Sequence, residues 1–465
     1  MSDLNEVPVV IGKVSIDGIK ATNHEFIKKQ MQHENLFSAK SMSEVLAEIK
    51  SIKERLEELE IFKTVTVKFD KCEKIIEDGA ANLDVIFNVE ESKARRFEAK
   101  AMCGLDNSVG LNLEMISPNL FGRATKLDAN YHNNVHGIGG WSATVIKPLE
   151  GIPRIKFALG SWSSTFDHWW SRFVESSMGG FGEVSLKTGC GQHQFRMETM
   201  WREIMAKEKV PIEVSKENGH SMKSSIKHIF TRDTRDDRIY PENGYRFSCT
   251  QELFSDMTTE GNIGGSRLSN INMKLEAELQ KSISLKQFVL ENTINWGLIR
   301  SMTHEETNVP IADRFFIGGP LTMRGFELRS MGPLTNDGYP IGSNFYLQHG
   351  FHVYSPLPFF SKDGYSSLFR LHYFLTSAVT ESSEQLLSSP NSNMASGDRA
   401  VSMNRVNQDW VQPYLRPIRM TTGLGIIFKL ANAFRIELNY CIPLRNQNSD
   451  RVVSGFQFGI GILYT

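Results

Sequence analysis

The chain contains no long apolar run. None of its 465 residues lies in an uninterrupted stretch of the roughly 18 apolar residues that a membrane-spanning helix requires, and the mean hydropathy is -0.29. This absence excludes a membrane protein built from helices. It does not exclude a membrane β-barrel, because barrel strands expose only every second residue to lipid and look half polar in any average.

An excess of charge of either sign is also missing. The 52 basic and 53 acidic residues give a net charge of -1, so a general attraction to nucleic acid is not expected. With no P-loop and no His-Glu-x-x-His motif, we expect no enzyme activity, no catalytic residues, no cofactor and no metal. The few cysteines lie far apart without Cys-x-x-Cys spacing, and we interpret them as free thiols: Cys72, Cys103, Cys190, Cys249 and Cys441.

The first residues, Met1-Ser2-Asp3-Leu4-Asn5-Glu6, lack the features of a targeting segment. They contain no basic region followed by an apolar one, so Sec-type export is not expected. An Arg-rich amphipathic presequence is absent as well.

Residues 1–95 show a mixed pattern that predicts a small α+β domain. An alternating segment near residue 15 is followed by capping boxes that open at Thr22 and Ser41 and predict two helices. Period-2 segments at 64–69 and 83–89 predict two strands. This β-α-α-β-β order fits a two-layer domain and resembles a single polypeptide-transport-associated (POTRA) domain. The second helix carries its apolar residues on one stripe: Val45, Leu46, Ile49, Leu56 and Leu59.

From residue 96 to 465 the helical pattern stops and period-2 segments of about 9–13 residues take over. In the last one Phe456, Phe458 and Ile460 alternate with Gln457 and Gly459. We count about sixteen such segments, which predicts a mainly β chain with a 16-stranded transmembrane antiparallel β-barrel. A soluble sandwich or propeller remains the alternative, because alternation alone cannot distinguish lipid from a protein core.

The expected connections alternate between short and long. Short turns fall at 117–119, 149–151 and 430–432, whereas long polar connections fall at 301–343 and 379–418. An even number of strands returns the chain to its starting side of the membrane. We therefore expect residues 1–95 and the short turns to share one compartment.

The connection 301–343 contains the most distinctive motif, Met323-Arg324-Gly325-Phe326, shortly after Phe315-Phe316-Ile317-Gly318-Gly319-Pro320. Alone, Arg-Gly-Phe is often an ordinary surface turn. Two further motifs accompany it, namely Asn119-Leu120-Phe121-Gly122-Arg123 and Asp233-Thr234-Arg235-Asp236 with Pro241 and Gly244 after it. In this order they resemble the BamA superfamily of outer-membrane protein assembly factors, over essentially the whole chain.

That resemblance implies that the long loop folds back into the barrel lumen and that Arg324 docks on an acidic residue of the inner wall. A guanidinium in a confined polar lumen needs such a partner, and Gly325 permits close backbone approach. Many family members carry the acidic element on strand thirteen, but here the stretch reads Phe374-Leu375-Thr376-Ser377-Ala378. The predicted partner of Arg324 is therefore Glu437, on the inward register of strand fifteen.

The C-terminal residues Gln457-x-Gly459-x-x-Ile462-x-Tyr464 resemble the sorting signal of mitochondrial barrel proteins. A barrel strand in which apolar and polar residues alternate can show this pattern by itself if it contains one glycine. Together with the absent Sec-type segment, however, it favours the mitochondrial outer membrane. Within the superfamily, the chain most resembles the barrel core subunits of the mitochondrial sorting and assembly machinery.

This resemblance implies an insertase with a lateral gate between strands one and sixteen. A precursor strand would pair with strand one at about Phe97, Ala99 and Ala101, while Gly459 and Gly461 are expected to weaken the closing seam. The expected partners are β-barrel precursors, the lipid bilayer, cytosol-side subunits of a sorting and assembly complex and, as a further candidate, an inner-membrane organising complex. The N-terminal domain is expected in the intermembrane space.

Two other functions remain open from the sequence. One is a passive outer-membrane channel or porin, which needs neither a precursor-binding domain nor a loop carrying Arg324. The other is a polypeptide translocon, which would usually bring several N-terminal domains.

Overall fold

The computed structural model of the chain contains a three-stranded sheet and a sixteen-stranded sheet. Within the described ranges, no helix is both long and apolar enough to cross a membrane. The structure describes residues 8–32, 34–72, 81–92, 95–103, 109–134, 138–258, 270–302, 309–357, 368–381, 418–430, 434–448 and 450–462.

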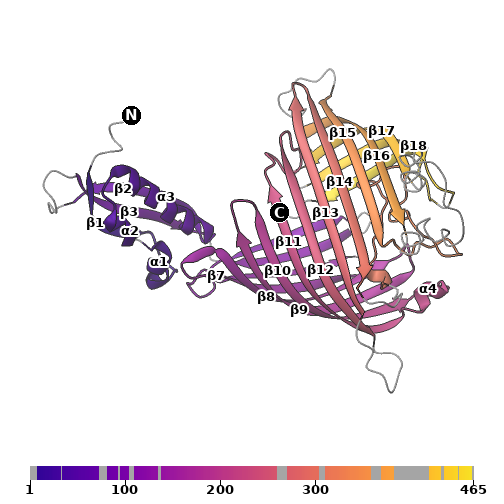
Figure 1. The fold of residues 1–465 in the computed structure, drawn as a ribbon, viewed down its shortest axis with the longest axis horizontal. Coiled ribbons are helices and arrows are strands. Elements are labelled where there is room, and N and C mark those ends of the chain that lie inside the picture. Colours follow the sequence, from indigo (N-terminus) through magenta and orange to yellow (C-terminus); the bar gives the residue numbers. More distant parts are fainter. Residues whose placement is uncertain are drawn as a thin grey trace, which may run out of the picture.

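The N-terminal unit packs helices against the small sheet (Figure 1). The strand order is β1-β3-β2, in which β1 is parallel and β2 antiparallel to β3. The short helix α2 adds a third helix to the two that were predicted, because five residues are too few to show a helical period. The elements are β1 (Val9–Asp17), α1 (His24–Met31), α2 (Glu34–Ser38), α3 (Met42–Glu58), β2 (Phe62–Lys71) and β3 (Ala81–Glu91).

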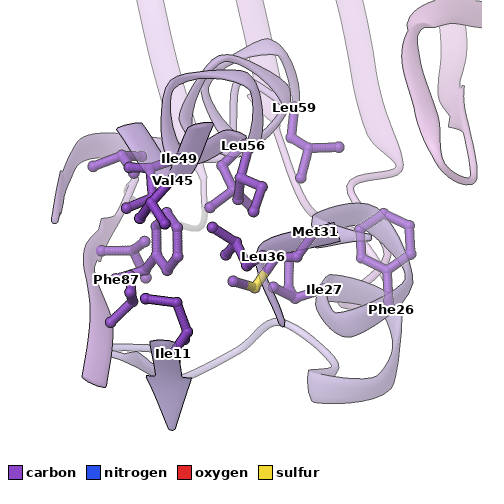
Figure 2. Packing of buried hydrophobic residues seen from close by; sticks show 14 of the residues in the cluster. Ile11, Phe26, Ile27, Met31, Leu36, Val45, Ile49, Leu56, Leu59 and Phe87 are labelled. Atoms are coloured by element: carbon purple, nitrogen blue, oxygen red, sulfur yellow. The ribbon is translucent and has the colours of Figure 1, made fainter. Parts of the chain in front are cut away.

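The core of this unit lies between the helices and the sheet. Figure 2 shows Val45, Ile49 and Leu56 of α3 facing Phe87 of β3, with Leu36 of α2 beside them. The predicted apolar stripe is wrong at one position, since Leu46 is 45% exposed and Ile52 is fully buried. Ile52 lies three residues after Ile49, on the same face of the helix.

The helix starts differ slightly from the prediction. Ser41 caps α3 as predicted, but α1 begins after Asn23, whose side chain accepts from the backbone N–H groups of Glu25 and Phe26 at 2.8 and 3.2 Å. Thr22, the predicted cap, instead donates its hydroxyl to Glu91 at 2.5 Å. Although burial raises the pKa of the Glu91 carboxyl, hydrogen bonds from Thr22 and Ala21 hold it below its ordinary value.

The large sheet is an antiparallel meander in which each strand pairs with the next along the chain. This confirms the predicted sixteen strands. In order they are β4 (Arg96–Cys103), β5 (Val109–Ser117), β6 (Lys126–Asn134), β7 (Gly139–Leu149), β8 (Ile152–His168), β9 (Phe173–Lys187), β10 (Gln192–Ala206), β11 (Gly219–Asp233), β12 (Gly244–Thr258), β13 (Asn270–Leu285), β14 (Phe288–Ser301), β15 (Phe345–Pro356), β16 (Phe369–Glu381), β17 (Arg419–Leu430), β18 (Phe434–Arg445) and β19 (Gly455–Ile462).

The two faces of the sheet differ in polarity along each strand. On β18 the exposed side chains of Leu438 and Tyr440 alternate with Glu437 and Asn439, which are each only 1% exposed. Exposed Phe456 and Phe458 continue the apolar face on β19. The apolar face is the one that suits lipid, and the polar face lines the inside.

The connection between β14 and β15, residues 302–344, is called loop six, and the sheet curves around its described residues 309–344. Its short 3₁₀ helix η1 (Ile311–Asp313) places Asp313 2.9 Å from Arg202 of β10. Further along, Arg324 donates to Glu437 of β18 at 2.7 Å. One loop thus contacts the seventh and fifteenth strands of the sheet order, so it lies on the concave face, which is the lumen.

The N-terminal unit contacts two turns of the large sheet, near β7 and β8 in Figure 1. At the turn after β5, Asn119 donates its amide to Thr22 and Gly122 accepts from the backbone of Asn23, both at 2.8 Å. At the turn after β7, Gly151 donates to Gln30 at 3.1 Å. The first of these turns is the Asn-Leu-x-Gly-Arg motif, so its observed contact is with the N-terminal unit.

Ion pairs join the same two parts on the outside of the junction. Arg154 of β8 donates to Glu58 at 2.9 Å, and Lys156 donates to Glu60 at 2.7 Å. A cavity of about 600 Å³ lies beside these pairs, between the end of α3 and the strands β8 and β9. The pairs are partly exposed and therefore contribute little individually.

The Asp-Thr-Arg-Asp motif forms the turn between β11 and β12, and this turn reaches across to later strands. Lys429 of β17 pairs with Asp237, and Arg370 of β16 donates to Glu242 at 2.7 Å. The buried Tyr240 donates its hydroxyl to the backbone of Leu368 at 3.0 Å. The turn thus connects the middle of the sheet to its C-terminal third.

Candidate functional site

The docked arginine of loop six is fully enclosed by the inner wall. Arg324 donates through Nε at 3.0 Å and Nη2 at 2.7 Å to one oxygen of Glu437, and both residues are buried. Glu437 also accepts from Arg435 at 2.6 Å and from Asn439 at 2.9 Å. The contact predicted between Arg324 and Glu437 is therefore present, and the carboxylate is compensated by two cations.

Strand thirteen, β16, supplies an aromatic ring to the same site. The Arg324 guanidinium lies 5.2 Å from the ring centroid of Phe374, within the range of a cation–π contact. From the same strand His372 forms a hydrogen bond with Asn439 at 3.2 Å. The stretch that lacks a carboxylate thus still contributes to holding the arginine and the residues around it.

Gly325 and Phe326 bring the backbone of loop six onto the last strand. Gly325 donates its N–H to Gln457 of β19 at 2.9 Å, and Gln457 donates its amide to the carbonyl of Phe326 at 3.0 Å. Gly325 has φ +81°, and a Cβ there would lie 2.7 Å from the Thr421 hydroxyl. Only glycine fits this close approach without displacing a neighbour.

The two predicted seam glycines lie under the same loop. A Cβ at Gly459 would be 3.1 Å from Pro320 and 3.2 Å from Leu321, and one at Gly461 would be 3.6 Å from Leu321. These glycines leave room for loop six on the inner face of β19. Their predicted effect on the seam remains a prediction.

The remaining predicted site residues lie elsewhere. Ile462 ends β19 opposite Phe434, and Tyr464 lies outside the described residues. In the gate strand, Phe97, Ala99 and Ala101 of β4 pair with β5, at the other end of the sheet order. The structure thus gathers the loop motif, Glu437, Gln457, Gly459 and Gly461 into one site and leaves the β4 residues apart from it.

The contact between Gln457 and loop six was not predicted. Alternation placed Gln457 on the inward face, but it gave no information on the path of the loop. The Gln457 side chain accepts from one backbone N–H of loop six and donates to one C=O. It thus replaces the hydrogen bonds that a neighbouring strand would make with this backbone. Among the described residues, no group of three or more His, Cys, Asp or Glu could hold a metal ion.

Comparisons of the sequence with known proteins identify its family. The model of the Omp85 superfamily domain matches residues 164–463. This chain belongs to the Omp85 superfamily. Within the superfamily, the sorting and assembly machinery component 50 homologs of Bos taurus and Homo sapiens are 32% and 31% identical to it, over 99% of this chain and 92% of each relative.

Two solved structures share the fold of this chain. BamA from Haemophilus ducreyi lacking POTRA domains 1–3 superposes with a TM-score of 0.69 at 14% identity, covering 97% of this chain and 84% of that one. CdiB from Acinetobacter baumannii gives 0.54 at 13% identity, covering 98% and 74%. The Omp85 fold, a small α+β unit before a sixteen-stranded sheet, is therefore established for this chain.

Proposed function

We propose that this Omp85 protein is an insertase that assembles β-barrel precursors into the mitochondrial outer membrane through a lateral gate between β4 and β19. The observation that carries the proposal is the hold of loop six on the last strand, through Gln457 at 2.9 and 3.0 Å. The names of its relatives, which are components of a sorting and assembly machinery, support the same activity.

The two outer strands of the sheet support a gate on physical grounds. Within the part of the chain that the structure describes, β4 and β19 each hydrogen-bond to one neighbouring strand. Backbone N–H and C=O groups cannot stay unpaired in lipid. An edge that opens there therefore pairs readily with an incoming strand, while loop six keeps β19 in place from the inside.

Cross-linking an arrested precursor tests the gate. Single cysteines at Ala99 of β4 and Phe458 of β19 should form adducts with a cysteine in the terminal strand of the precursor. Met197→Cys, at an outward-facing position of β10, is the matched control and should give none. Adducts confined to an inward position such as Asn295→Cys of β14 would overturn the gate and favour a channel or a translocon.

We expect Gly461→Val to slow precursor assembly by about fivefold, because a β-branched residue favours the strand by up to ~1 kcal/mol and packs on Leu321 at ordinary distance. The measurement is the assembly rate of a labelled barrel precursor in isolated mitochondria. Gly182→Val on β9 is the matched control, since a Cβ there would also meet a leucine at 3.6 Å. Equal assembly rates in the two variants would contradict the prediction that Gly461 weakens the seam.

The orientation of the N-terminal unit follows from the same proposal. The unit contacts the turns after β5 and β7, which share one end of the sheet with the turn after β11. We place this end in the intermembrane space, which protease protection in intact mitochondria checks. The opposite end would then face cytosol-side subunits of the complex, and the N-terminal end would face an inner-membrane organising complex.

A further inference from the structure

A second buried ion pair joins loop six to the wall opposite Glu437. Asp313 accepts from both terminal nitrogens of Arg202 on β10, at 2.9 and 3.1 Å, and from Lys223 on β11 at 2.6 Å. All three residues are at most 5% exposed. The bidentate fork is the strong and directional form of the interaction between an arginine and a carboxylate.

Other acidic residues also lie near the two cations, but Asp313 lies between them. Arg202 also lies 3.1 Å from Glu175, and Lys223 lies 3.0 Å from Glu252. Asp313 is nevertheless the acidic residue that contacts both cations at hydrogen-bond distance within the described cluster. Its carbonyl accepts from Lys274 of β13 at 3.2 Å, so its backbone is held as well.

The chain around Asp313 is fixed by further contacts. Ile311 is buried with Phe173, Ile204 and Val214, and its N–H donates to Glu217 at 2.6 Å. These residues belong to β9, β10 and the connection between β10 and β11. Residues 311–313 of loop six therefore pack on the wall formed by strands six to eight of the sheet order.

We propose that Asp313 is a second positioning residue, which anchors loop six to β10 and β11 so that its Arg-Gly-Phe end is held against β19. This inference rests on the proposed function, because it gives the docked loop a role at the gate. Arg202 and Lys223 lie on the seventh and eighth strands and Glu437 on the fifteenth, so the two anchors sit on opposing walls. Residues 313–324 of loop six thus form a strut across the lumen, held at both ends.

The native thiol of Cys441 reports whether the strut is in place. Cys441 on β18 is completely buried, and a Cβ at Gly325 would lie 3.5 Å from it. A chain whose other four cysteines are replaced by alanine would be reconstituted in lipid vesicles and treated with a small maleimide. In this parent, docked loop six should keep Cys441 unreactive.

Asp313→Asn should raise the alkylation rate of Cys441 by roughly tenfold or more, since the neutral amide removes the negative charge that pairs with both cations and replaces one acceptor oxygen by an NH2 group. Asp337→Asn is the matched control, because it removes the same charge from an exposed position of the same loop. Asp313→Glu keeps the carboxylate and should restore protection. Loss of protection that Asp313→Glu does not rescue would indicate a general packing defect and would overturn the anchor.

The outcomes separate this inference from the proposed function. Continued protection of Cys441 in Asp313→Asn, at normal resistance to protease, would overturn the anchor whatever the assembly rate is. Exposed Cys441 with slowed precursor assembly in mitochondria supports both the anchor and its role at the gate. Exposed Cys441 with normal assembly supports the anchor and contradicts the need for a docked loop in insertion.

Discussion

Arg324→Ala should reduce the rate of precursor assembly to less than about a tenth of the normal rate, because breaking a buried ion pair costs about 3–5 kcal/mol. Glu437 would keep Arg435 as a partner at 2.6 Å but would lose two hydrogen bonds, at 3.0 and 2.7 Å. The contacts of Gln457 with the loop backbone at Gly325 and Phe326 would remain. The measurement is the assembly of a labelled barrel precursor in mitochondria that contain equal amounts of either protein.

The matched control for this prediction is Arg451→Ala. Arg451 also donates to loop six, at the carbonyl of Gly338 at 2.8 Å, but it is exposed. Its loss should therefore leave assembly close to normal. The double variant Arg324→Ala/Glu437→Gln should lose less than the sum of the two single losses, because the pair of Arg324 with Glu437 is common to both changes, whereas the pair of Arg435 with Glu437 is lost only in Glu437→Gln. Normal assembly by Arg324→Ala would contradict the docking role.

The second large effect is expected from Gly325→Ala. A non-glycine residue at φ +81° costs about 1–2 kcal/mol, and the new Cβ would lie 2.7 Å from the Thr421 hydroxyl. The added methyl group must push the loop away from β17 and lengthen the hydrogen bond from Gly325 to Gln457. We expect assembly to fall roughly tenfold, because the strain and the clash add.

Gly338→Ala separates the two causes of this effect. Gly338 lies in the same loop with φ +79°, but a Cβ there would meet nothing within 4 Å. It therefore carries the backbone strain without the clash, and its assembly rate should stay within about threefold of normal. Equal losses in the two variants would mean that loop strain, rather than contact with the wall, limits assembly.

The sequence predicted the sheet and the partner of Arg324 because both follow from period-2 alternation. Once β18 is a strand with Leu438 outside, Glu437 must point inward. The absence of a carboxylate between Phe374 and Ala378 then left Glu437 as the nearest inward acid that could be named. Whether a residue lies an even or an odd number of positions from Leu438 decides its face of the strand, without any knowledge of the tertiary fold.

What alternation could not give is the path of an irregular loop. Asp313 reads as an ordinary loop residue, and nothing near it in sequence indicates Arg202 and Lys223, which are 111 and 90 residues away. The contact between Gln457 and Gly325 was missed for the same reason. In the N-terminal unit, Asn23 replaced Thr22 as the cap because Thr22 finds a partner in Glu91, which lies 69 residues later.

The charges of loop six also determine which way round the loop can lie in the lumen. An anion, Asp313, meets cations on β10 and β11, whereas a cation, Arg324, meets an anion on β18. In the reversed arrangement Asp313 would lose both of its cations and lie beside Glu437, whose charge already pairs with Arg435. Arg324 would lose Glu437 and lie beside Arg202 and Lys223, whose acidic neighbours Glu175 and Glu252 are already paired. An ionised group that is buried without its partner destabilises the fold by about 3–5 kcal/mol. The barrel wall is thus complementary to one orientation of the loop. A barrel that closes around a reversed loop is less stable than the native one.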